Sequence, residues 1–185
     1  MNKKLKLWEL NRLTKEAFIV KDKAPIVVIL DELRSFENVG SIFRTSDAFC
    51  VHQLALCGIT PVPPHREIHR TALGATESVS WRYFEKTMDA VIYYKQLGYQ
   101  VYAVEQAEQT ILLNAIKGME ISKIAVIFGN EVNGVNQSVI DACDGVIEIP
   151  QFGTKHSLNV SVCAGIVLWE CSKRLNPALQ EESYL

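Results

Sequence analysis

Short apolar runs of strand length alternate along this chain with stretches in which apolar residues recur every three or four positions. The runs, rich in β-branched residues, predict six strands, at Ile26–Leu30, Gln53–Cys57, Val79–Phe84, Tyr99–Val104, Lys123–Phe128 and Val146–Ile149. The helical patterns fall at Val39–Phe49, Met88–Leu97, Gln137–Cys143 and Val160–Cys171. This alternation predicts an α/β fold, a mostly parallel sheet with helices on both faces.

The start of the chain differs in charge from the rest. We expect a short basic N-terminal helical extension at residues 1–23, with a helix over Leu5–Phe18, and one domain at residues 24–185. Residues 1–23 hold seven Lys/Arg against three Asp/Glu, a local net charge of +4, whereas the remainder carries −6. Two interpretations stay open for the extension. Its cations contact a polyanion such as RNA, or its apolar side chains pack it onto the domain.

Composition and motifs exclude several classes of protein. With 48% hydrophobic and 22% charged residues, the chain is neither disordered nor a coiled coil. No apolar run approaches the ~18 residues of a membrane span, and Glu9 and Arg12 interrupt any signal peptide, so we expect a cytoplasmic protein. Five cysteines without a Cys-x-x-Cys pair fit a reducing compartment. No metal site is expected, because His65 and His69 lack the intervening Glu of a zinc-binding helix.

Polar residues gather after the first predicted strand, at the kind of position where α/β enzymes place their sites. Asn38 is expected to cap the N-terminus of the following helix. Arg44 follows Gly40 by four positions and has other small helical neighbours, which leaves its guanidinium free to reach a ligand. The alternative is a surface pair with Asp47, three positions later.

Two further segments follow the last two predicted strands. In Ile127–Val135, two glycines permit close approach of the backbone to a ligand, but the Lys-Ser/Thr of a phosphate-binding loop is missing. In Ile147–Val162, Ser157 and Asn159 stand at the start of the last helix, where free backbone N–H groups can cradle a ligand. Turn formation and helix capping are the alternatives for these residues. No Gly-x-Gly-x-x-Gly occurs, which disfavours a dinucleotide binder, and the missing phosphate loop disfavours a flavodoxin-type nucleotide binder.

Together, in this order and spacing, these segments resemble the three motifs of the SpoU/TrmH family, which belongs to the SPOUT class of knotted RNA methyltransferases. The motifs are Asn38-Val39-Gly40 with Arg44-Thr45, Phe128-Gly129-Asn130-Glu131 with Gly134-Val135, and Ile149-Pro150 with Gly153 and Ser157–Val162. The segment Arg70–Ala75 also resembles the family. The resemblance implies a SPOUT fold with a C-terminal trefoil knot and S-adenosylmethionine as methyl donor. It also implies a ribose 2′-hydroxyl of tRNA or rRNA as acceptor, and a homodimer.

The resemblance further assigns roles to individual residues. Family positions that hold the cofactor are matched by Val104, Gly129, Ile149 and Leu158. The polar catalytic set is matched by Asn38, Arg44, Glu131, Ser157 and Asn159. The chain departs from the family where Cys50 replaces a common glycine and Cys163 a common alanine.

The family's use of Arg44 as a base conflicts with guanidinium chemistry, because a group with a pKa above ~12 stays protonated. We therefore expect Arg44 to contact the hydroxyl or the adjacent phosphate, while the proton leaves through a phosphate oxygen or water. Glu131 is expected to hold the site in shape or to pair with Arg44. In the dimer, the small residues Ser161, Ala164 and Gly165 are expected at the interface. Two alternatives remain: a knotted methyltransferase acting on a base nitrogen, and a noncatalytic RNA-binding protein of the same fold.

Overall fold

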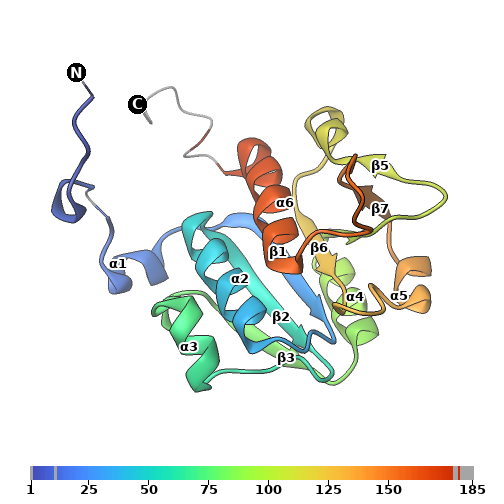
Figure 1. Ribbon diagram of the computed structural model, residues 1–185, viewed down its shortest axis with the longest axis horizontal. Helices are drawn as coiled ribbons and strands as arrows, with labels where there is room; N and C mark the ends of the chain where they lie inside the picture. The colour runs from blue at the N-terminus through green and yellow to red at the C-terminus, as the bar shows by residue number, and fades with distance from the viewer. Residues whose placement is uncertain (1, 11, 177–178, 180–185) are drawn as a thin grey trace.

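The computed structural model describes residues 2–10, 12–176 and 179, and a parallel sheet forms its centre (Figure 1). The strands are β1 (Ala24–Asp31), β2 (Val51–Cys57), β3 (Trp81–Phe84), β4 (Gln100–Val104), β5 (Ile111–Leu112), β6 (Ile124–Phe128) and β7 (Gly145–Glu148). They lie in the order β3-β2-β1-β6-β4-β7-β5, and each neighbouring pair is parallel. The six predicted strands are all present, whereas β5, with two residues, is too short to leave a pattern in the sequence.

Helices cover both faces of this sheet. On one face lie α2 (Phe36–Ala48) and α6 (Val160–Leu175), with α3 (Arg66–Ala72) beside α2, and on the other lie α4 (Thr87–Gln96) and α5 (Gln137–Asp141) (Figure 1). The run in β1 shows why both faces are covered. Ile26, Val28 and Leu30 are buried in one layer, and Val27 and Ile29 in the other. Of the helices described here, none is long and apolar enough to cross a membrane.

Helix α3 packs closely on α2, and this contact requires glycine at position 40. A Cβ on Gly40 would lie 2.0 Å from Thr71 Oγ1 and 2.4 Å from the carbonyl oxygen of Ile68. Gly40 therefore has a packing role against α3 that its place beside Arg44 in the sequence did not indicate, while Arg44 itself is exposed.

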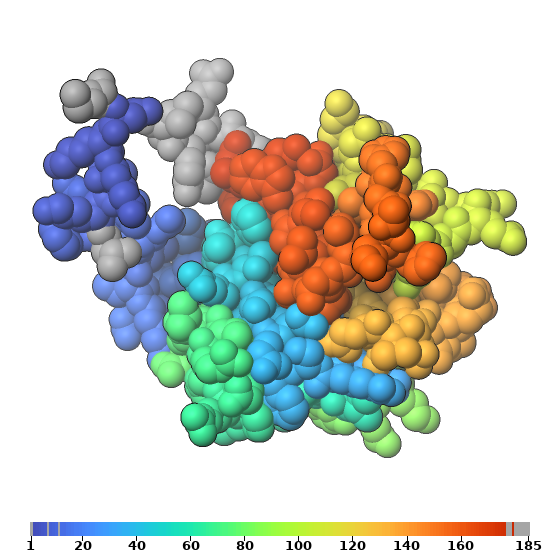
Figure 2. All heavy atoms as spheres, viewed as in Figure 1, coloured from blue at the N-terminus to red at the C-terminus, as the bar shows by residue number. Residues whose placement is uncertain are grey.

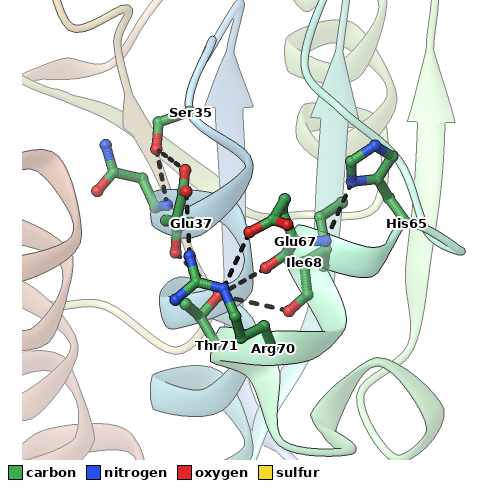
Figure 3. A network of polar contacts seen from close by, with 8 residues as sticks. Ser35, Glu37, His65, Glu67, Ile68, Arg70 and Thr71 are labelled. Atoms are coloured by element: carbon green, nitrogen blue, oxygen red, sulfur yellow. Dashed lines mark hydrogen bonds and ion pairs between the residues drawn. The ribbon is translucent and has the colours of Figure 1, made fainter.

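The sequence analysis did not predict α3. Polar contacts along this helix fix it to α2 (Figure 3). His65 caps α3, since its Nδ1 accepts a hydrogen bond from the backbone N–H of Glu67 (3.3 Å), and its ring stacks on Phe36 with centroids 3.9 Å apart. Arg70 pairs with Glu67 (2.9 Å) and with Glu37 of α2 (3.2 Å). His65 thus caps α3 and stacks on Phe36, and Arg70 ties α3 to α2.

The N-terminal extension departs from the predicted helix over Leu5–Phe18. It forms a 3-10 turn at Leu7–Glu9 and a six-residue helix α1, Lys15–Val20. Trp8 and Leu13 are 75% and 52% exposed, and Figure 2 shows this segment projecting from one end of the molecule. Helices in proteins draw most of their stability from the packing of an apolar face, and because these side chains stay exposed the longer helix does not form.

The apolar side chains on which the packing interpretation depends do not pack well. They are Leu5, Leu7, Trp8, Leu10, Leu13 and Phe18. The side chain of Leu7 lies outside what the structure describes, and among the others only Phe18 is half-buried. An exposed ion pair, Lys15–Glu77 (2.5 Å), reaches the domain. The division of the chain between residues 23 and 24 stays a prediction.

Candidate functional site

A cavity of about 510 Å³ opens at the carboxyl edge of the sheet, where β4, β6 and β7 end. Its walls are the loops that follow these strands and the first turn of α6. The strand order explains its position, because the chain runs from β1 out to β2 and β3 and then returns to place β4 and β6 on the other side of β1. Open α/β sheets bind ligands at such reversals. The four predicted cofactor residues all line the cavity: Val104, Gly129, Ile149 and Leu158.

The loop after β6 is folded back on itself by the side chain of Asn130. Its Oδ1 accepts hydrogen bonds from the backbone N–H groups of Val132 (2.9 Å) and Asn133 (3.3 Å), and its Nδ2 donates to the carbonyl oxygen of Glu32 (2.6 Å). The backbones of Asn130 and Gly134 exchange two hydrogen bonds. Asn130 is buried and lines the cavity, yet the sequence analysis quoted it in a motif without giving it a role.

The glycines of this loop are required by the loop itself. A Cβ on Gly129 would lie 2.2 Å from backbone atoms of both Gly134 and Val135. Gly134 has a φ of +67°, and a Cβ there would lie 2.2 Å from Glu105 Oε2. A side chain at either glycine therefore has to displace part of the cavity wall.

Glu131, Asn38 and Asn159 form a hydrogen-bonded chain beside the cavity. Asn38 Nδ2 donates to Glu131 Oε1 (3.1 Å), and Asn159 Nδ2 donates to Asn38 Oδ1 (3.2 Å). The Glu131 carboxylate also accepts from the backbone N–H groups of Arg34 (3.0 Å) and Ser35 (3.1 Å). Because Glu131 and Asn159 line the cavity, this chain connects its wall to the start of α2.

The surroundings of Glu131 favour its ionised form. Partial burial acts to raise the pKa of its carboxyl group, but hydrogen bonds from the Arg34 backbone, the Asn38 side chain and the Ser35 backbone outweigh burial, so its pKa lies below the ordinary value. All of these partners are donors, which suits a carboxylate that is ionised. The contacts fit the expectation that Glu131 holds the site in shape.

Asn38 does not cap α2, contrary to the expectation from the sequence. Ser35 is the N-cap, and its Oγ accepts a hydrogen bond from the backbone N–H of Asn38 (3.1 Å). Asn38 thus lies within the first turn of the helix, and its side-chain amide is available for the chain of contacts described above. Asn159 does cap α6, where its Oδ1 accepts from the backbone N–H of Ser161 (2.9 Å).

The other two predicted catalytic residues are not part of the hydrogen-bonded chain of Glu131, Asn38 and Asn159. Ser157 is exposed and lines the cavity just before α6. Arg44 is exposed on α2, is not part of the cavity lining, and makes no ion pair with any residue that the structure describes. Asp47, its alternative partner, instead accepts a hydrogen bond from Ser78 Oγ (2.5 Å).

Three carboxylates line the cavity, from Glu105, Glu131 and Glu148. The sequence analysis gave no role to Glu105 or Glu148. Their position relative to the strands could have indicated them, since Glu105 directly follows the predicted strand Tyr99–Val104 and Glu148 is the last residue of β7. Within residues 2–10, 12–176 and 179, no group of three or more His, Cys, Asp or Glu side chains is arranged to hold a metal ion.

Comparison with known proteins identifies the family. The model of the SpoU rRNA Methylase family matches residues 25–169, and the chain belongs to this family. It is 32% identical over 161 residues to an uncharacterized tRNA/rRNA methyltransferase of Borreliella burgdorferi, covering 87% of this chain and 69% of the relative. It is 29% identical over 172 residues to the tRNA (guanosine(18)-2'-O)-methyltransferase of Thermus thermophilus, covering 92% and 86%. Other relatives are longer, and the chain spans 62% of one from Bacillus subtilis.

Solved structures show the same architecture. The AdoMet-bound rRNA methyltransferase from Sinorhizobium meliloti superimposes with a TM-score of 0.76 at 27% identity, covering 83% of this chain and 58% of that one. The TrmH/SpoU tRNA modifying enzyme of A. aeolicus gives 0.74 at 24% identity, covering 86% and 79%. The predicted α/β fold with a mostly parallel sheet is confirmed, and these similarities support the C-terminal trefoil knot.

Proposed function

We propose that this protein is an S-adenosylmethionine-dependent RNA methyltransferase that modifies a ribose 2′-hydroxyl of tRNA or rRNA in the cytoplasm. The observation that carries the proposal is the way in which the three motifs meet. The second and third form walls of one cavity, and Asn38 of the first is hydrogen-bonded to both. Membership of the SpoU family supports this activity, as does similarity to proteins named as tRNA and rRNA 2′-O-methyltransferases.

The cavity suits S-adenosylmethionine in size and lining. Its volume of about 510 Å³ is typical of pockets for small ligands. Val104, Ile149 and Leu158 offer apolar surface to an adenosine, and Gly129 leaves its backbone open to close approach. In the described part of the chain no Lys, Arg or His lines the cavity, which disfavours a nucleotide phosphate. When bound there, S-adenosylmethionine supplies a methyl group on a positively charged sulfur.

The polar residues beside the cavity position the acceptor ribose. Methyl transfer needs an in-line approach of the hydroxyl oxygen and removal of its proton. The amides of Asn38 and Asn159 are oriented by their hydrogen bonds, and Ser157 adds a hydroxyl at the cavity wall. Arg44 contacts the hydroxyl or the adjacent phosphate with its planar guanidinium, and the proton of the hydroxyl leaves through a phosphate oxygen or water.

We also propose a homodimer that uses the exposed face of α6. Val162, Ile166 and Trp169 follow one another at helical spacing and are 53%, 38% and 48% exposed, an apolar stripe that a monomer leaves in water. Of the residues expected at the interface, Ala164 is fully buried within its own subunit, so its assignment is wrong, whereas Gly165 has open space beside it. Light scattering at micromolar concentration checks the dimer, and a fully active monomer of 20.8 kDa would contradict it.

One experiment separates the proposed activity from the two alternatives. The purified protein is incubated with S-adenosylmethionine labelled in its methyl group and with unmodified tRNA or rRNA, and the RNA is digested to nucleosides. Label in 2′-O-methyl nucleosides supports the proposal. Label in base-methylated nucleosides favours the base-nitrogen enzyme, and RNA binding without any transfer favours the noncatalytic protein.

A further inference from the structure

The cavity has a charge that the acceptor does not explain. Among the residues that the structure describes, its lining carries three carboxylates and no Lys, Arg or His. RNA is a polyanion, so negative charge beside the acceptor site opposes its binding. The proposed donor has the complementary charge: its sulfonium and ammonium groups against one carboxylate give a net charge of +1. The thioether product that remains after methyl transfer has a net charge of zero.

Two of the three carboxylates are engaged in holding other parts of the protein. Glu131 accepts from two backbone N–H groups and from Asn38 at the start of α2, as described above. Glu148 Oε2 accepts a hydrogen bond from the hydroxyl of Thr110 (2.6 Å), just before β5.

Glu105 also accepts hydrogen bonds from neutral partners, but its charge acts on another wall of the cavity. It directly follows β4, its Oε1 accepts from the backbone N–H of Gln106 (2.9 Å), and its Oε2 accepts from that of Val135 (3.2 Å). It lies against Gly134, and it makes no ion pair with any residue in the described part of the chain. Its charge is felt at the α6 wall of the cavity, where burial, and then the charge of Glu105, raise the pKa of Cys163 to about 12.

We propose that Glu105 makes this cavity select the positively charged methyl donor over its uncharged product. The inference rests on the proposed function, since it assumes that S-adenosylmethionine binds here. A carboxylate whose partners are neutral attracts a cation more strongly in a partly dehydrated cavity than in water. Because the ligand loses its extra positive charge when the methyl group leaves, the residue that strengthens donor binding also favours exchange of product for new donor.

Calorimetry with three ligands tests this role. S-adenosylmethionine and sinefungin, an analogue with an amine in place of the methylated sulfur, both have a net charge of +1, whereas S-adenosylhomocysteine is neutral overall. Glu105→Gln removes the charge with little change in shape. We expect it to weaken binding of both charged ligands about tenfold and to change binding of S-adenosylhomocysteine less than about twofold. Glu108→Gln removes the same charge from an exposed position outside the cavity and should leave the binding of all three ligands unchanged.

The outcomes separate charge selection from a structural role. If Glu105→Gln weakens all three ligands equally, the residue acts only by holding the Val135 backbone, and the inference is overturned. If Glu108→Gln has the same effect as Glu105→Gln, a general surface charge explains the preference and the inference also fails. A wild-type protein that binds none of the three ligands would overturn the proposed function itself, and the inference with it.

Discussion

The side-chain amide of Asn159 donates a hydrogen bond to the side-chain oxygen of Asn38 over 3.2 Å, although 121 positions separate the two residues in the sequence. The contact joins the N-cap of α6 to the first turn of α2. Glu131, 93 positions from Asn38, accepts a hydrogen bond from the amide nitrogen of the Asn38 side chain. Since each amide has its oxygen and nitrogen engaged, the three motifs hold one another in place.

Glu131→Gln should lower the stability of the protein at neutral pH, and its difference from the wild type should shrink in acid. The pKa of Glu131 is lowered in the folded protein, so its ionised form stabilises the fold above the unfolded-state pKa of ~4.3. This contribution is lost as the pH falls through the lowered folded-state value. Denaturant unfolding of both proteins at pH 7 and pH 3 measures the difference. A difference that is constant or grows in acid would contradict the assigned hydrogen bonds.

Gly129→Ala should abolish cofactor binding and destabilise the protein by ~1–3 kcal/mol, the usual range for overpacking. The added methyl group would lie 2.2 Å from the backbone of Gly134 and Val135, so the loop has to move. Gly118→Ala is the matched control, because among the described residues, its chain neighbours aside, no atom lies within 4 Å of its Cβ position. Calorimetry and thermal unfolding check both variants. Normal cofactor affinity in Gly129→Ala would show that the loop is not part of the cofactor site.

Arg44→Ala should abolish methyl transfer and leave cofactor affinity within a few fold of the wild type. Arg44 is exposed and is not part of the cavity lining, so we expect it to act on the acceptor and not on the cofactor. Arg44→Lys should fail as well, because a point charge does not reproduce the planar fork of a guanidinium. Turnover and calorimetry are measured on the same preparations. Near-normal turnover of Arg44→Lys would rule out a specific role for the guanidinium.

Deleting residues 1–20 should leave a folded protein that binds S-adenosylmethionine normally and RNA more weakly. The exposed apolar side chains of this segment contribute little to the core, and its basic residues are the expected partners of RNA phosphates: Lys3, Lys4, Lys6, Arg12 and Lys15. For every phosphate that the truncated protein no longer binds, the slope of log affinity against log salt concentration should flatten by a little under one unit. Binding titrations over a range of salt concentrations measure this slope. An unfolded truncation would favour packing, and an unchanged slope would remove the extension from RNA recognition.

The sheet could be predicted from the sequence, while one helix could not. Strands buried on both faces read as continuous apolar runs, and Ile26–Leu30 of β1 is such a run. Helix α3 has seven residues, of which only Ile68 and Ala72 are buried, so it has too few apolar positions to show a period. The need for glycine at position 40 follows from α3 and was missed with it.

Several of the residues that line the cavity could be found from the motifs, but their contacts could not. Ser35 and Asn38 are both suitable N-caps three positions apart, and the fold decides between them. The hydrogen bonds that join Asn38 with Glu131 and with Asn159 depend on how β1, β6 and α6 are placed in space, which local periodicity does not record. Glu105 has no role in the motifs, and only the cavity shows its place.

The most direct test of the central claim is to map 2′-O-methyl groups across the tRNA and rRNA of cells with and without this gene. The account predicts that at least one ribose methylation disappears without the gene. The wild-type protein should restore it, and the Arg44→Ala variant should not. Unchanged ribose methylation at every position, or the disappearance of a base methylation in its place, would contradict the account.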